Sequence, residues 1–169
     1  MLSELVVLSP DTLKAGEVTV RCAIGKAGFS DDKREGDNKT PLGAYPLRCC
    51  YYRPDRVERP QTGLEVIAIT PEMGWCDAPH HPDYNKPVKL PFNPSHEKLW
   101  RDDNAYDIII PMGYNDVSPV SGKGSAIFFH LAQPDFRGTE GCIAIAKEEM
   151  LKLLPHLHPQ TMVRIHPKL

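Results

Sequence analysis

Short apolar runs rich in β-branched and aromatic residues recur along the whole chain, each bounded by Gly, Pro or charged residues. Such runs of roughly four to eight residues are typical of β-strands. The expected strands cover residues 4–9, 17–25, 44–52, 64–70, 106–111, 125–132, 141–146 and 161–166. Helical spacing occurs in residues 147–157, where the apolar face is formed by Met150, Leu151, Leu153 and Leu154. The sequence therefore predicts a mainly β fold with one helix near the C-terminus.

Prolines set the middle of the chain apart. Many of the 17 prolines lie within residues 71–104, where missing amide donors and fixed φ angles are expected to prevent a regular strand ladder. Loops of this length are usually functional or disordered. The aromatic residues of the segment, Trp75, Tyr84, Phe92 and Trp100, supply area to pack against the rest of the protein. We therefore expect a long, ordered, proline-rich lid.

Length and charge narrow the class of protein. A chain of 169 residues with 41% apolar residues suits one core, so we expect a single domain over residues 1–169. A formal charge of −2 provides no basic field, which disfavours binding to nucleic acid. No apolar stretch approaches the roughly 18 residues of a membrane span. The N-terminus has no basic region typical of a secretory signal, which leaves two alternatives, a cytoplasmic protein or one whose leader was removed.

The sequence GTEGCIAIA places Cys142 before a short apolar run. A cysteine taken alone is more often a buried apolar residue than a nucleophile. His130 changes this interpretation, because it ends the run SAIFFH, and pairing of the two strands would bring the imidazole close to the thiol. An adjacent imidazolium lowers a thiol pKa from ~8.5 by several units and so gives a nucleophile at neutral pH. Gly141 permits close approach of a substrate, and the amides of Gly141 and Cys142 are candidate donors to a tetrahedral oxyanion.

Three segments, GDNKTPLGAYPL, SAIFFHLA and TEGCIAIA, occur in this order. Together they resemble the L,D-transpeptidase catalytic domain of the YkuD (ErfK/YbiS/YcfS/YnhG) family over residues 18–165. The family pattern is a histidine, a spacer, Ser or Thr, any residue, Gly, Cys and a hydrophobic residue. It is matched by His130, Thr139, Gly141, Cys142 and Ile143. A second family pattern, TPxG followed by Thr, Ala or Arg and then an aromatic residue, is matched by residues 40–45, and the two together are more specific than either alone.

The resemblance implies an L,D-transpeptidase-like β-sandwich or barrel that acts on peptidoglycan stem peptides. Cys142 would attack the carbonyl of an L-centre in a stem tetrapeptide, D-Ala would leave, and an acceptor amine would attack the thioester. His130 would move protons in both steps, oriented by a backbone carbonyl in the neighbourhood of His130 and Leu131. Neither a metal nor an organic cofactor is implied. The expected location is the cell envelope, with a role in cell wall biogenesis and cell shape.

The sequence departs from the family pattern at three places. Glu140 replaces the usual second histidine and adds a negative charge near the thiol. Ala144 stands where Arg or Asn is common, and the spacer between His130 and Thr139 is short. Two alternatives therefore stay open. One is an L,D-carboxypeptidase or other thiol amidase that uses water as the acceptor, and the other is an inactive module that binds the cell wall.

Further residues are candidates for substrate contacts. Thr139 and Glu140 precede the expected nucleophile, and Arg34 offers a bidentate fork for a substrate carboxylate, although most charge runs are solvated surfaces. Trp100 either contacts a sugar or peptide or packs the lid against the body. Cys76 and the histidines after it have no recognised metal-ligand spacing, so no metal site is expected.

Overall fold

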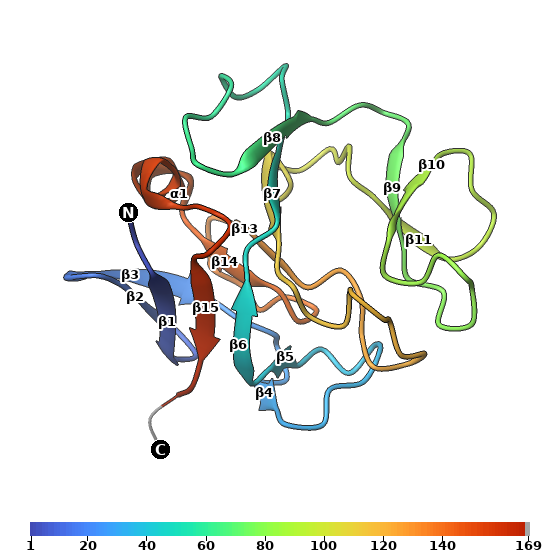
Figure 1. Cartoon of the computed structure of the whole chain (residues 1–169), viewed down its shortest axis with the longest axis horizontal. Coiled ribbons are helices and arrows are strands. Elements are labelled where there is room, and N and C mark those ends of the chain that lie inside the picture. Colours follow the sequence, from blue (N-terminus) through green and yellow to red (C-terminus); the bar gives the residue numbers. More distant parts are fainter. Residues whose placement is uncertain (168–169) are drawn as a thin grey trace.

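Residues 1–167, which the computed structural model describes, confirm a mainly β fold with one α-helix near the C-terminus (Figure 1). The largest sheet has ten strands in the order β6-β15-β1-β2-β3-β14-β13-β12-β7-β8. Their bounds are β1 (Glu4–Ser9), β2 (Thr12–Ala15), β3 (Val18–Ala23), β6 (Gly43–Pro46), β7 (Cys49–Tyr52), β8 (Glu65–Ala68), β12 (Ile108–Pro111), β13 (Phe128–Leu131), β14 (Ile143–Ile145) and β15 (Met162–Ile165). A separate two-stranded sheet consists of β4 (Phe29–Ser30) and β5 (Thr40–Pro41).

The ten-stranded sheet curls on itself. β6 stands at one end of the strand order and β7 near the other, although the two strands follow each other directly in the chain. Leu47, between them, forms a bridge with Met112, and the N–H of Gly113 donates to Pro46 O at 2.8 Å. The curl encloses the main apolar core, in which the largest buried side chains include Leu5, Leu13, Leu47, Ile108, Phe129, Ile143 and Ile145.

Along β13 and β14, alternate side chains point into the main core and to the opposite face of the sheet. Successive side chains of a strand point to opposite faces. Phe129 and Ile143, which are paired in register, belong to the main core. Phe128 and Cys142, which directly precede Phe129 and Ile143, belong to a second apolar cluster on the other face. Because β13 and β14 pair in parallel with His130 opposite Ala144, the Cys142 and His130 side chains emerge on this same outer face.

The helix α1 (Lys147–Leu153) continues into a 3-10 turn, η1 (Leu154–His156). Met150, Leu153 and Leu154 are buried against the main core, as predicted. The prediction for Leu151 is wrong, because its side chain is 43% exposed. At 3.6 residues per turn, position 151 is rotated about 100° away from position 150 and so faces outward. No helix within residues 1–167 combines the length and the hydrophobicity that a membrane span requires.

The proline-rich segment folds into a three-stranded antiparallel sheet in the order β10-β9-β11. Its strands are β9 (Met73–Cys76), β10 (Pro87–Lys89) and β11 (His96–Lys98). The prediction that prolines prevent a ladder here is wrong, because the central strand has none and Pro87 begins an edge strand, where a proline is tolerated. Trp75 packs edge-on against Phe128 with ring centroids 5.0 Å apart. The role of the segment as an ordered lid stays a prediction.

Candidate active site

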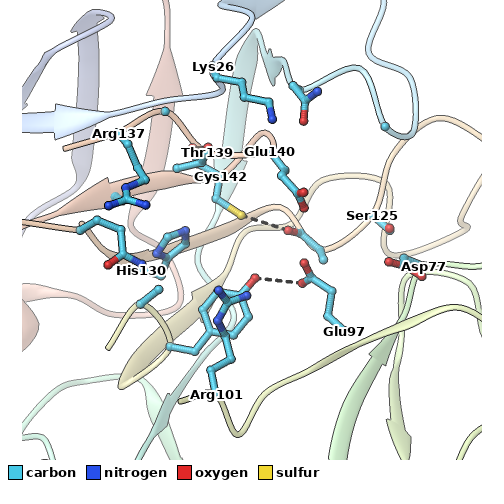
Figure 2. A pocket seen from close by; sticks show the side chains of 18 of the residues that line it. Lys26, Asp77, Glu97, Arg101, Ser125, His130, Arg137, Thr139, Glu140 and Cys142 are labelled. Carbon is cyan, nitrogen blue, oxygen red and sulfur yellow. Dashed lines mark hydrogen bonds between the residues drawn. The ribbon is translucent and has the colours of Figure 1, made fainter. Parts of the chain in front are cut away.

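A cavity of about 650 Å³ opens on the outer face of β13 and β14 (Figure 2). Its walls come from β13, which carries His130, from the turn that leads into β14 and carries Cys142, from the loop between β3 and β5, and from the segment of residues 71–104. The charged lining residues are Lys26, Lys33, Glu35, Asp77, Glu97, Arg101, Asp103, Arg137 and Glu140. A cavity of this size accommodates a ligand such as a short peptide segment.

Cys142 lies at the floor of the cavity, where it is 7% exposed. Its thiol donates to Ala126 O at 3.2 Å and accepts from the Phe128 N–H at 3.4 Å. Burial raises the pKa of the thiol to about 12, and the charges of Glu97 and Glu140 act in the same direction. At neutral pH the sulfur is therefore protonated, in agreement with its donor role toward a carbonyl.

His130 lines the same cavity as Cys142. Its Nδ1 lies 2.9 Å from Leu131 O, and because a carbonyl only accepts, Nδ1 carries the proton and Nε2 has a free lone pair. Burial lowers the pKa of the ring to about 4. The structure thus favours a neutral imidazole beside a neutral thiol. The prediction of a thiolate stored beside an imidazolium at neutral pH is wrong for this arrangement.

The turn before Cys142 is fixed by Thr139 and Gly141. The Thr139 hydroxyl donates to Cys142 O at 2.6 Å and accepts from the Gly141 N–H at 3.1 Å. Gly141 has φ +141°, and a Cβ at this position would lie 2.8 Å from Lys39 O. These contacts require glycine at position 141. They also engage the Gly141 amide, so the prediction that this amide points at an oxyanion is wrong.

Thr40 connects the second sequence motif to the cysteine motif. Its buried hydroxyl donates to Gly141 O and accepts from the Gly25 N–H, both at 2.8 Å. Thr40 therefore ties the turn that carries Cys142 to the loop after β3. The two motifs, far apart in the sequence, form one hydrogen-bonded unit.

Glu97 is a cavity residue that the sequence did not indicate. It lies on β11, and Tyr106 Oη donates to Glu97 Oε2 at 2.9 Å (Figure 2). Burial raises the pKa of this carboxyl to about 7. The segment HEKLWRDD contains several charged residues, and no spacing within it distinguishes Glu97 from a solvated acid. Only the pairing of β11 with β9 brings Glu97 to the cavity.

Two of the predicted substrate residues lie outside the cavity lining. Arg34 is exposed and pairs with Asp32 at 3.1 Å, whereas its neighbour Lys33 is the residue that lines the cavity. Trp100 packs on the second apolar cluster, under the guanidinium of Arg53 at 3.6 Å from its ring centroid. Of the two roles considered for Trp100, packing of the proline-rich segment against the body is the one that fits, because the Arg53 guanidinium already covers the indole ring.

The other predicted residues lie at the cavity. Thr139 and Glu140 both line it, and Glu140 is exposed. Arg101, which the sequence places next to Trp100, also lines it and forms an ion pair with Asp103 at 2.6 Å. Within residues 1–167, no group of three or more His, Cys, Asp or Glu side chains is arranged to hold a metal ion.

The fold and the cavity define a class, a mainly β domain with a cysteine and a histidine on one face of two paired strands. The chain belongs to the YkuD family, described as the L,D-transpeptidase catalytic domain, whose model matches residues 5–165. Members of this family are L,D-transpeptidases, which act on peptidoglycan peptides.

A solved structure, that of Bd1075 from Bdellovibrio bacteriovorus, resembles the chain with 17% sequence identity and a TM-score of 0.49. The similarity covers 96% of this chain and 46% of Bd1075, so the chain spans less than half of that protein. No curated protein matches the chain.

Proposed function

We propose that the chain is an active L,D-transpeptidase in which Cys142 is the nucleophile and His130 the general base. The observation that carries this proposal is the placement of both side chains in one cavity of about 650 Å³, on the same face of the parallel pair β13 and β14. The hydrogen bond from Nδ1 to Leu131 O leaves Nε2 as the proton acceptor. The donor is a peptidoglycan stem peptide.

In the first half-reaction, Sγ attacks the carbonyl carbon of an L-centre in the donor peptide while the thiol proton passes to Nε2 of His130. Because the thiol and the imidazole are both neutral in the structure, proton transfer accompanies attack and does not precede it. Collapse of the tetrahedral intermediate breaks the C–N bond, and the imidazolium returns the proton to the departing amine. A thioester on Cys142 and a free D-amino acid result.

In the second half-reaction, an acceptor amine attacks the thioester carbonyl and gives up a proton to Nε2. The C–S bond then breaks, and the proton passes from the imidazolium to the sulfur, which restores the thiol. Because the Gly141 amide is engaged by Thr139, we assign oxyanion stabilisation to the Cys142 amide.

The cationic side of the cavity suits the leaving residue of the donor. Arg137 and His130 lie on one side of the Cys142 sulfur in Figure 2, and Arg101 lines the same cavity. A guanidinium binds a carboxylate by a bidentate hydrogen bond. Ala144, opposite His130 in register, presents no such group. We assign the carboxylate of the departing D-residue to Arg137, in place of the family side chain that Ala144 lacks.

Product analysis tests the proposal. The protein is incubated with a stem tetrapeptide, with and without an acceptor amine, and the products are identified by mass spectrometry. Cross-linked or amine-exchanged product is expected, together with release of the D-residue. Dominance of the hydrolysed tripeptide in the presence of acceptor would instead identify an L,D-carboxypeptidase. Absence of any turnover would identify an inactive binding module.

A further inference from the structure

Three acids, Glu97, Asp77 and Glu140, gather on one side of the nucleophile. In Figure 2 they lie on the side of the Cys142 sulfur opposite His130 and Arg137, and all line the same cavity. The proposed reaction uses the sulfur and the cationic side but gives this acidic side no role.

The pairing of β9 and β11 builds this side. Glu97 is directly opposite Trp75 in the antiparallel register, and Asp77 follows Trp75 by two residues. Because side chains alternate along a strand, Trp75, Asp77 and Glu97 share one face of the small sheet. Diagonal neighbours in such a pair are ~7–8 Å apart, close enough for two carboxylates to contact one cation between them.

Neither carboxylate of this small sheet has a cationic partner among residues 1–167. Two of the cavity's cations are already paired with other acids, since Asp37 holds Lys33 at 2.5 Å and Asp103 holds Arg101 at 2.6 Å. Among the described residues, none donates a hydrogen bond to the buried Asp77 Oδ1. An unsatisfied carboxylate oxygen is costly, and because Asp77 lines the cavity, a donor from a bound ligand would offset that cost.

We propose that Glu97 and Asp77 form a subsite for a primary ammonium group of the substrate, next to Cys142. The inference rests on the proposed function and adds to it a specificity-determining pair. A primary ammonium has three N–H donors and can satisfy both carboxylates at once. The ammonium comes either from the side chain of a diamino acid in the donor peptide or from the acceptor, whose ammonium must lose a proton before the amine attacks the thioester.

An ammonium at this position also affects the nucleophile. The negative charge of Glu97 opposes ionisation of Cys142, so a cation bound to Glu97 removes part of that opposition. Substrates that carry the ammonium therefore acylate the enzyme faster as well as bind more tightly.

Two donor peptides test the inference, one with a free side-chain amine on its third residue and one with that amine acetylated. Acylation of Cys142 is followed by intact mass without acceptor, and kcat/KM is compared as a ratio within each preparation, so that any misfolded fraction cancels. Glu97→Gln and Asp77→Asn are compared with the wild type. Glu65→Gln, at the exposed first position of β8, is the matched control.

If the donor supplies the ammonium, the wild type and Glu65→Gln prefer the free amine by about 10- to 100-fold. The ratio then falls below about 3 in Glu97→Gln. If the acceptor supplies it, the donor ratio is near one and the KM for the acceptor amine rises at least about tenfold in Glu97→Gln. If the donor ratio and the acceptor KM are the same in both variants as in the wild type, the inference is overturned. The proposed function stands in that case as long as the wild type is still acylated. Absence of acylation by either peptide in the wild type would remove the proposed function and the inference together.

Discussion

Replacing Thr40 by Val tests whether the two sequence motifs act as one unit. Valine has the shape of threonine without the hydroxyl, so it leaves no cavity but deprives the Gly25 N–H and Gly141 C=O of their 2.8 Å hydrogen bonds. Thr40 is fully buried, so water does not replace these bonds. Each unsatisfied buried group costs about 1–3 kcal/mol, which gives a loss of about 2–6 kcal/mol in the free energy of unfolding. For a chain of this size, each kcal/mol lowers Tm by roughly 2–4 °C.

The assay is urea unfolding together with the acylation rate of Cys142. Thr40→Ser is the matched control, because serine keeps the hydroxyl and loses only a methyl group. We expect Thr40→Ser to stay much closer to the wild type than Thr40→Val. We also expect Thr40→Val to slow acylation, because the turn at Gly141 loses an anchor. Stability of Thr40→Val within about 0.5 kcal/mol of the wild type would refute the reasoning, as would equal damage in the two variants.

Three further predictions follow from the site. Gly141→Ala should lose about 2 kcal/mol or more of stability in urea unfolding and nearly all acylation, because its Cβ would lie 2.8 Å from Lys39 O at φ +141°. Asn85→Ala should lose about 3–5 kcal/mol in the same measurement, because its side chain is hydrogen-bonded to Trp75, Ala126, Tyr114 and Asn115, and an unchanged free energy of unfolding would contradict this role. The third concerns the pH dependence of stability, to which His130 and Glu97 contribute with opposite sign. The folded pKa of His130 is about 4 against an ordinary 6.5, so its contribution to stability increases by about 3 kcal/mol as pH rises through that window. The folded pKa of Glu97 is about 7 against an ordinary 4.5, so its contribution decreases by about 3 kcal/mol as pH rises through that window. Glu97→Gln should therefore make stability rise more steeply between about pH 4 and 6.5 than in the wild type, and His130→Gln should make it fall between about pH 4.5 and 7. Identical slopes in both variants would contradict these assignments.

The sequence predicted those parts of the fold that depend on local pattern. The apolar runs of β1, β12, β13 and β15 have strong β propensity, and each was expected within a few residues of its observed bounds. The strand β2 (Thr12–Ala15) was missed, since TLKA is short and has few β-branched residues. The sheet of β9, β10 and β11 was missed because its prolines suggested a loop, whereas their tolerated positions depend on which strand forms the edge.

The site was predictable where the chemistry is tied to a motif. His130 and Cys142 occur in adjacent predicted strands, and alternation with parallel pairing is enough to place them on one face. Their protonation states were not predictable, because these depend on burial produced by Trp75, Tyr106 and the remainder of the second cluster. Glu97 was not predictable either, since it reaches the cavity only through the pairing of β11 with β9.

The most direct test of the proposed chemistry is to locate the acyl group after incubation with a stem tetrapeptide. Intact mass followed by peptide mapping distinguishes Cys142 from the four other cysteines of the chain. We predict a single adduct of the donor minus its D-residue on Cys142, its slower formation in His130→Gln, and none in Cys142→Ala. An adduct on another residue, or turnover that survives Cys142→Ala, would contradict the assignment of Cys142 as nucleophile.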